Sequence, residues 1–177
     1  MDATNLSPRE LADALRAQAK GGYAEEAAVD LLIAHGYWLR NSYLRQYVDY
    51  ETDPAAHGGP PMAAVRWQDA IAALDAGKLP CSTSEGQIFR IAASLGGWIP
   101  VNLRDAISGL DHVNIRLVAE AILRANGREG YTVTVPKPPL YPPGVRVVEA
   151  GTGRVLQEGD QSAGTLTVPG GVSEGEQ

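Results

Sequence analysis

Apolar residues recur at helical spacing from the start of the chain. Ser7 and Glu10 form a capping box in "SPRE", with proline at the first helical position, and predict a helix that ends before Gly21. Alanine and leucine follow the i, i+3, i+4, i+7 pattern over residues 23–35, and Gly36 suits the residue that closes a helix. We therefore expect two consecutive helices in this part of the chain.

Helical spacing continues in five further segments. A second capping box, formed by Ser82 with Glu85 or by Ser84 with Gln87, precedes an apolar stripe that is expected to end at the glycine pair 96–97. Shorter apolar stripes with good capping residues lie on either side of it. The expected helices cover residues 37–50, 62–76, 84–95, 102–108 and 112–126.

The pattern changes after Gly127. Residues 131–135, "YTVTV", alternate like a strand, and "PKPPLYPPG" favours an extended polyproline II conformation. Residues 145–159 are typical of two short strands around a Gly-Thr-Gly turn. The predicted organisation is a mainly α, multi-helix domain, a small C-terminal β-rich appendage that includes the extended segment, and a disordered tail, over residues 1–127, 128–168 and 169–177.

Five of the chain's eleven aromatic residues fall in "YWLRNSYLRQYVDY", the segment expected to form the third helix. A tyrosine ring packs well in a core while its hydroxyl reaches the surface. The interpretation that we favour assigns the following residues to the core, with tyrosine hydroxyls at its margin: Trp38, Leu44, Tyr47 and Val48.

The same segment is also a candidate surface for a protein partner. A helix would bring Arg40 and three of the tyrosines onto one face, and Tyr, Trp and Arg are enriched at binding hot spots. Nucleic acid is less favoured, because the acidic residues at 49, 51 and 53 would repel a phosphate chain. The predicted partner-binding residues are Trp38, Arg40, Tyr43, Tyr47, Tyr50 and Tyr141.

The composition is that of an ordinary globular protein, with 44% hydrophobic and 20% charged residues. The net charge of −6 is opposite in sign to that of proteins with a general affinity for nucleic acids. The single cysteine, Cys81, excludes an internal disulfide. Neither a signal peptide nor an apolar stretch of about 18 residues is present, so we expect a cytoplasmic protein.

No sequence motif indicates a cofactor, a metal or a catalytic centre. H-E-x-x-H, the EF-hand loop, the phosphate-binding P-loop and the dinucleotide-binding G-x-G-x-x-G are all lacking from the sequence. We therefore expect a non-enzymatic protein with no cofactor and no metal site.

A DNA-binding regulator is the first alternative, because residues 84–135 have the element order of a winged helix-turn-helix. In that arrangement His112, Asn114 and Arg116 would meet the bases near the start of the longer helix. The charges weaken this alternative, since four arginines and four acidic residues between Ser82 and Gly127 sum to zero.

A thiol-dependent enzyme that acts on a small molecule is the second alternative. Cys81 directly precedes an expected helix start, where the helix dipole can lower the pKa of a thiol. A nucleophile also needs a base, and the three histidines are far apart in the sequence. A small buried hydrophobic residue is the favoured interpretation of Cys81.

The stretches "RWQDAIAALDAGKLPCSTSEGQIFRIAASLGG" and "IPVNLRDAISGLDHVNIRLVAEAILRANG" resemble a group of small uncharacterised actinobacterial proteins from accessory and mobile-element regions. The resemblance covers residues from about 65 to 127. It implies a bacterial, phage- or plasmid-associated origin. It carries no activity, so no catalytic or binding residue is transferred.

The sequence as a whole favours a protein-interaction or accessory module. Its partner is expected to be another protein or a second copy of the chain, and not a membrane. The tyrosine face and the proline-rich segment are the expected contact surfaces.

Overall fold

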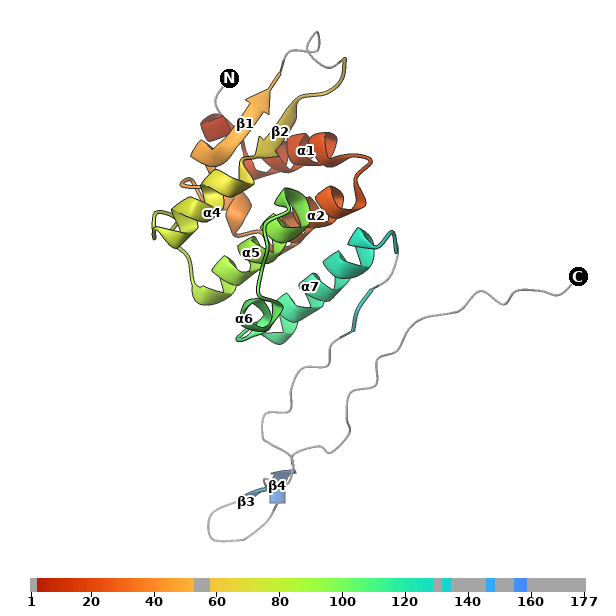
Figure 1. The fold of residues 1–177 in the computed structure, drawn as a ribbon. Helices are drawn as coiled ribbons and strands as arrows, with labels where there is room; N and C mark the ends of the chain where they lie inside the picture. Colours follow the sequence, from red (N-terminus) through yellow and green to blue (C-terminus); the bar gives the residue numbers. More distant parts are fainter. Residues whose placement is uncertain (1–2, 53–57, 129–131, 135–145, 149–154, 159–177) are drawn as a thin grey trace, which may run out of the picture.

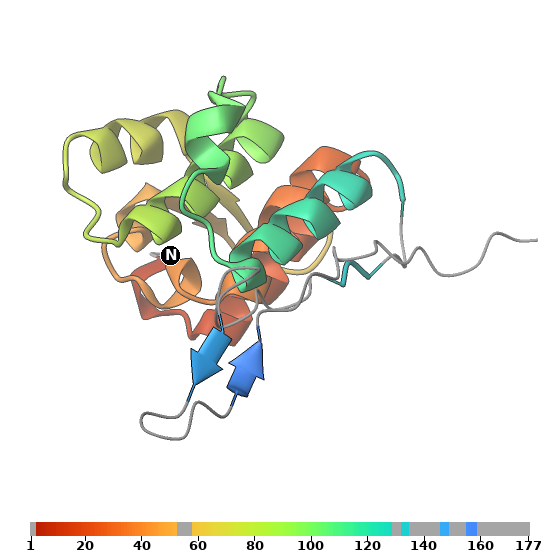
Figure 2. The same cartoon turned by 90° about the horizontal axis from the view of Figure 1, so that it is seen from below.

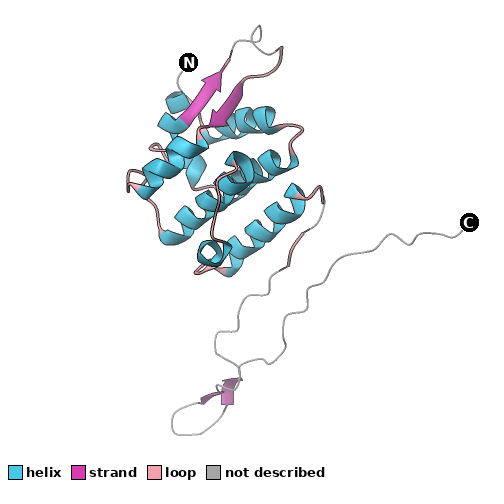
Figure 3. Cartoon of the chain, in the orientation of Figure 1, coloured by secondary structure: helices cyan, strands magenta, loops and turns pink. Residues whose placement is uncertain are grey.

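The structure, a computed structural model, describes residues 3–52, 58–128, 132–134, 146–148 and 155–158. Most of these residues are helical, and the mainly α class expected from the sequence is confirmed (Figure 3). Within the described part, the α-helices are α1 (Pro8–Ala19), α2 (Tyr23–His35), α4 (Trp67–Asp75), α5 (Thr83–Gly97), α6 (Leu103–Ile107) and α7 (His112–Ala125).

A two-stranded antiparallel sheet packs beside α1 at one end of the helical body (Figure 1). Strand β1 (Val48–Glu51) pairs with β2 (Met62–Val65), so that Val48 lies opposite Val65 and Glu51 lies opposite Met62. Three 3-10 turns precede the sheet in the chain: η1 (Ala3–Asn5), η2 (Trp38–Arg40) and η3 (Arg45–Tyr47).

Helix α2 is the centre of the fold and packs along both α5 and α7 (Figures 1 and 2). Its residues Ala27, Ala28 and Leu32 are fully buried. Alanine side chains let neighbouring helices approach closely, and a helix that is apolar on several faces is stable only when it is surrounded. The core therefore forms around α2, with Trp38 and Phe89 as its largest buried side chains.

Ion pairs also tie α2 to α7 and to α1. The Arg124 guanidinium on α7 lies 2.8 Å from a Glu26 carboxylate oxygen and 2.6 Å from an Asp30 carboxylate oxygen on α2. Arg16 on α1 lies 3.2 Å from the other Asp30 oxygen. This network connects the consecutive helices α1 and α2 with α7, which is distant from both in sequence.

The glycine pair near the end of α5 allows helices to approach closely. A Cβ atom on Gly97 would lie 2.5 Å from Cβ of Trp67, and one on Gly96 would lie 2.9 Å from Cβ of Ala28. Both distances are shorter than van der Waals contact. The expectation that this pair ends the helix needs correction: both glycines lie within α5, and Trp98 is its C-cap.

The prediction of a helix over residues 37–50 is wrong. The chain instead makes the turns η2 and η3 and then enters β1. The Asn41 side-chain oxygen accepts a hydrogen bond from the Tyr43 backbone N–H at 2.9 Å, a local contact that competes with helix formation. Residues from Val48 onward find backbone partners in β2, which a helix could not offer.

Arg45 holds this non-helical segment in place. It is only 6% exposed, and its guanidinium donates to the backbone carbonyls of Ala3, Leu6 and Leu39. Burial lowers the pKa of Arg45. A buried cation with three backbone acceptors fixes the N-terminal residues against η2, and the sequence pattern gave no sign of it.

The helix expected over residues 62–76 begins later than predicted. Residues Met62–Val65 form β2, and α4 starts only at Trp67. Arg66 joins the two elements, because its guanidinium pairs with Asp49 at 3.1 Å and with Asp69 at 3.3 Å. The short apolar run "MAAV" is compatible with either structure, and strand pairing decided it.

In the C-terminal part, residues 132–134 are not in a strand, in contrast to the prediction for 131–135. Strand β3 (Arg146–Val148) pairs antiparallel with β4 (Val155–Glu158). The proline-rich segment with Tyr141, the Gly-Thr-Gly turn and the predicted disordered tail lie outside the described residues.

None of the helices in the described ranges combines the length and the apolar character that crossing a lipid bilayer requires.

Candidate functional site

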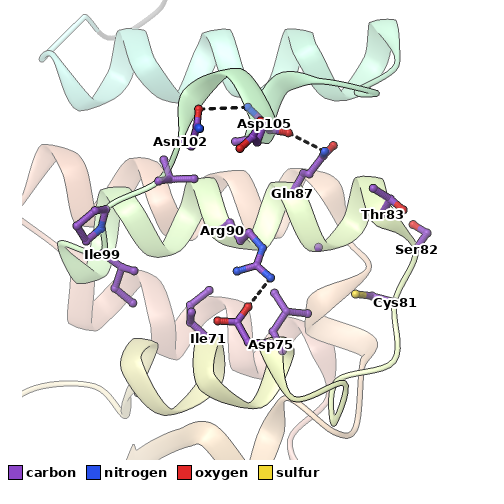
Figure 4. Close-up of a pocket in the computed structure, with 15 residues that line it drawn as sticks. Ile71, Asp75, Cys81, Ser82, Thr83, Gln87, Arg90, Ile99, Asn102 and Asp105 are labelled. Carbon is purple, nitrogen blue, oxygen red and sulfur yellow. Dashed lines mark hydrogen bonds and ion pairs between the residues drawn. The ribbon is translucent and has the colours of Figure 1, made fainter.

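A groove runs along α5, between α4 on one side and α6 with the preceding loop on the other (Figure 4). Its volume is about 660 Å³, within the range of small-ligand and peptide sites. The wall residues used below are Ile71, Leu74 and Asp75 from α4, Gln87 and Arg90 from α5, and Ile99, Val101, Asn102 and Asp105 from the other side. We call it the α5 groove.

One end of the α5 groove is built by the start of α5. Glu85 accepts from the Ser82 backbone N–H at 2.6 Å, and Ser82 Oγ accepts from the Glu85 N–H at 3.3 Å, so the expected capping box forms. Gly86 and Cys81 line the same end of the groove, and a Cβ on Gly86 would lie 3.4 Å from Cys81 Sγ. The helix start is thus fixed by local bonds.

Two polar bridges cross from α5 to the walls (Figure 4). Arg90 forms an ion pair with Asp75 on α4. Gln87 Nε2 donates to the Asp105 backbone carbonyl on α6 at 2.8 Å. Since that carbonyl can only accept, the amide orientation of Gln87 is determined, and its Oε1 remains a buried acceptor without a donor among the described residues.

The other end of the α5 groove, where Ile99 lies, has apolar lining (Figure 4). Ile99 and Val101 come from the loop after α5, and α4 contributes Ile71 and Leu74 to the lining of the groove. These four side chains are all partly exposed. A ligand that fills this end would remove apolar surface from water.

Trp98 directly precedes the loop residues at this apolar end. It has φ 57° and ψ 26°, and it is the one non-glycine residue with positive φ among the described residues. Its side chain is 86% exposed. Glycine normally occupies this left-handed position after a helix, so a large exposed aromatic residue there is unusual.

Further apolar side chains are exposed on α6 and at the start of α7. Leu103 and Ile107 are one helical turn apart on α6, and Val113 lies in the first turn of α7. All three are exposed. Together with Trp98, they are four of the seven exposed large hydrophobic residues in the described part of the chain.

The aromatic segment does not form the predicted surface. Trp38 is fully buried, donates from Nε1 to the Glu85 carbonyl at 2.9 Å, and packs against Phe89 with ring centroids 4.5 Å apart. The core interpretation is confirmed for Trp38, Leu44 and Val48, while Tyr47 is half-buried against the core.

The other predicted partner-binding residues are spread over several elements. Arg40 ends the turn η2, Tyr43 is exposed in the following loop, and Tyr50 lies half-buried in β1. The single helical face that was to unite them is not present. Arg40 and Tyr43 do line a shallow hollow with Tyr37, whose hydroxyl donates to the Pro80 carbonyl at 2.6 Å.

Two of the three proposed DNA-contacting residues are engaged within the protein. Asn114 is only 9% exposed, and its amide donates to Ser84 Oγ at 2.8 Å. Arg116 lies 2.9 Å from a Glu120 oxygen that also accepts from the Val133 backbone N–H. His112 is half-buried. Asn114 and Arg116 are thus engaged in contacts within the protein, whereas a recognition helix would need these side chains free to meet the bases.

Cys81 does not have the surroundings of a catalytic thiol. Burial and the nearby Glu85 carboxylate raise its pKa, and Arg90 lowers it less. Within the described part of the chain, no hydrogen bond joins Cys81 to a histidine. The thiol therefore stays protonated at neutral pH, which disfavours nucleophilic chemistry.

The described residues contain no group of three or more histidine, cysteine, aspartate or glutamate side chains that could hold a metal ion. Comparisons of the chain with protein-family models, with curated proteins and with solved structures found no match.

Sequence reasoning missed the α5 groove and Trp98. A groove between three helices depends on packing, which no local pattern reveals. Trp98 did leave a signal: a tryptophan directly after a helix that was expected to end in glycine stands where a left-handed residue is needed.

Proposed function

We propose that this chain is a non-enzymatic protein-binding module of a bacterial cytoplasm, in a phage- or plasmid-associated system. Its contact surface is the α5 groove together with Trp98. This replaces the aromatic segment as the expected surface, since Trp38 is in the core and the tyrosines are dispersed.

Trp98 is the observation that carries the proposal. The left-handed conformation costs a residue with a Cβ roughly 1–2 kcal/mol relative to glycine. Packing of the Trp98 ring within the domain offsets little of this conformational cost, because the exposed ring removes almost no apolar surface from water. Strained residues that the fold does not need are concentrated at functional sites.

Burial of the Trp98 ring against a partner would stabilise the complex. A tryptophan side chain can bury about 150–250 Å² of surface, and tryptophan is among the residues most enriched at interface hot spots. The neighbouring Ile99 and Val101 would extend the same contact into the α5 groove.

The test uses Trp98→Asn, because asparagine tolerates the left-handed conformation and keeps the helix end intact. Wild type and variant are immobilised, exposed to native bacterial lysate with and without nuclease treatment, and bound proteins are identified by mass spectrometry. Tyr43→Ala removes another exposed aromatic ring and serves as the control.

The expected result is a partner that survives nuclease treatment, is lost with Trp98→Asn and is retained with Tyr43→Ala. Thermal unfolding of Trp98→Asn should match or exceed that of wild type. Identical captured proteins on all three surfaces would contradict the proposal. Loss of every partner on nuclease treatment would favour the DNA-binding alternative instead.

A further inference from the structure

We infer that the α5 groove recognises a peptide segment of the partner in which a lysine or arginine lies next to apolar residues. This inference rests on the proposed protein-binding function and specifies the partner's chemistry. It follows from the charges, the hydrogen-bonding groups and the apolar walls of the groove.

The charges of the α5 groove favour a cation. Its charged lining residues are Asp75, Arg90 and Asp105, which leave a net charge of −1. Arg90 is already paired with Asp75. The Asp105 carboxylate makes no ion pair within the described part of the chain, so it is the group that a basic side chain would meet.

The hydrogen-bonding groups point to the same chemistry. Gln87 Oε1 is a buried acceptor on the α5 floor, and Gln87 binds through its amide nitrogen to the backbone of Asp105. Gln87 Oε1 itself is shielded from solvent, so the exposed Asp105 carboxylate is the acceptor that a ligand in the groove would reach. An ammonium or guanidinium group has several N–H donors and no acceptor, and so it suits this carboxylate.

The apolar lining of the groove explains why the peptide should carry apolar residues next to its basic residue. Ile71 and Leu74 of α4 and Ile99 and Val101 of the loop that follows Trp98 all line the groove. A peptide with its basic side chain at Asp105 would lay its adjacent apolar side chains toward these walls. A carboxylate ligand fits less well, because Asp75 and Asp105 flank the single arginine.

Chemical-shift titration of the full-length, isotope-labelled protein tests the inference with three peptides: acetyl-Leu-Lys-Leu-amide, the same peptide with norleucine, and the same peptide with glutamate. The lysine peptide should shift the resonances of Gly86, Gln87 and Asp105. It should bind about fivefold more tightly than the norleucine peptide, as a favourable charge pair allows. The glutamate peptide should bind most weakly.

Asp105→Asn should reduce the preference for lysine over norleucine to nearly one. Asp13→Asn, which changes the same charge on the exposed face of α1, should leave the preference unchanged. Equal binding of the three peptides, or shifts confined to other parts of the protein, would overturn the inference.

The chain's own basic, proline-rich segment is the competing occupant, since Lys137 lies next to apolar residues in "VPKPPLY". If Lys137→Glu in the full chain makes the lysine peptide bind more tightly, this segment occupies the groove and the partner assignment is overturned. A partner lost with Trp98→Asn, without any preference for lysine peptides, would leave the proposed function standing and this inference refuted.

Discussion

Residues 83–125 and residues 37–65 differ in how far local pattern decides their structure. In the first region, Ser82, Asn102 and Asp111 cap the three helices with side-chain hydrogen bonds to backbone amides, as predicted. In the second, helical spacing is present but the described backbone forms turns and two strands. A buried arginine and strand pairing supply backbone partners there that a helix would not offer. Local pattern decides structure only where tertiary packing agrees with it.

The strongest test of this comparison is to remove the buried guanidinium with Arg45→Leu. The backbone carbonyls of Leu6 and Leu39 would lose their donor, while that of Ala3 keeps the Leu6 backbone N–H at 3.3 Å. Each unsatisfied buried acceptor costs about 1 kcal/mol or more, so we expect a loss of at least about 2 kcal/mol in the free energy of unfolding. Urea denaturation followed by circular dichroism measures it.

Arg40→Leu is the matched control, because Arg40 is exposed at the end of η2. It should change stability by less than about 0.5 kcal/mol. If the two variants were equally stable, Arg45 would not be what holds residues 37–50 out of a helix.

A smaller change in stability is expected in residues 83–125, the region where local pattern and structure agree. Gly97→Ala raises helix propensity by about 1 kcal/mol but places a Cβ 2.5 Å from Cβ of Trp67. Overpacking of this kind costs about 1–3 kcal/mol, and we expect net destabilisation in chemical denaturation. Ser94→Ala, one turn earlier in α5, adds no Cβ and should be nearly neutral. A stabilised Gly97→Ala protein would show that α4 and α5 are less tightly packed than described.

The smallest change in stability is expected at His35, which contacts Tyr37 of the second region and is influenced by Glu85 of the first. Burial lowers the pKa of His35, while the more distant Glu85 and Asp111 raise it less. The neutral form is therefore favoured in the folded protein. Its contribution to stability is fully present above the unfolded pKa of about 6.5 and decreases as the pH falls toward the folded pKa.

His35→Gln removes this titration. The stability difference between wild type and His35→Gln, measured by urea denaturation at pH 7.5 and pH 5.5, should shift in favour of the variant at the lower pH. A difference that does not change with pH would mean that His35 has the same pKa in the folded and unfolded states.

The sequence was sufficient for the helical class and for the starts of α1, α5, α6 and α7, because caps are local signals. It was not sufficient for β1 and β2, whose pairing joins residues more than ten positions apart. It also could not reveal the α5 groove, which three helices and a loop form together. The aromatic segment was correctly assigned to the core through Trp38, yet its helical geometry was wrong, since the hydrogen bonds of Arg45 cannot be inferred from spacing.

The ion pairs of Arg124 have a consequence for synthesis on the ribosome. Helix α2 leaves the exit tunnel early, but its partners α5 and α7 are made later, and Glu26 and Arg124 are 98 residues apart. Until α7 emerges, the apolar faces of α2 lack their final cover, and exposed apolar surface of this kind is a target for chaperones. Translation pauses before residue 112 should therefore increase chaperone binding and aggregation of the nascent chain, whereas pauses after α7 has emerged should not.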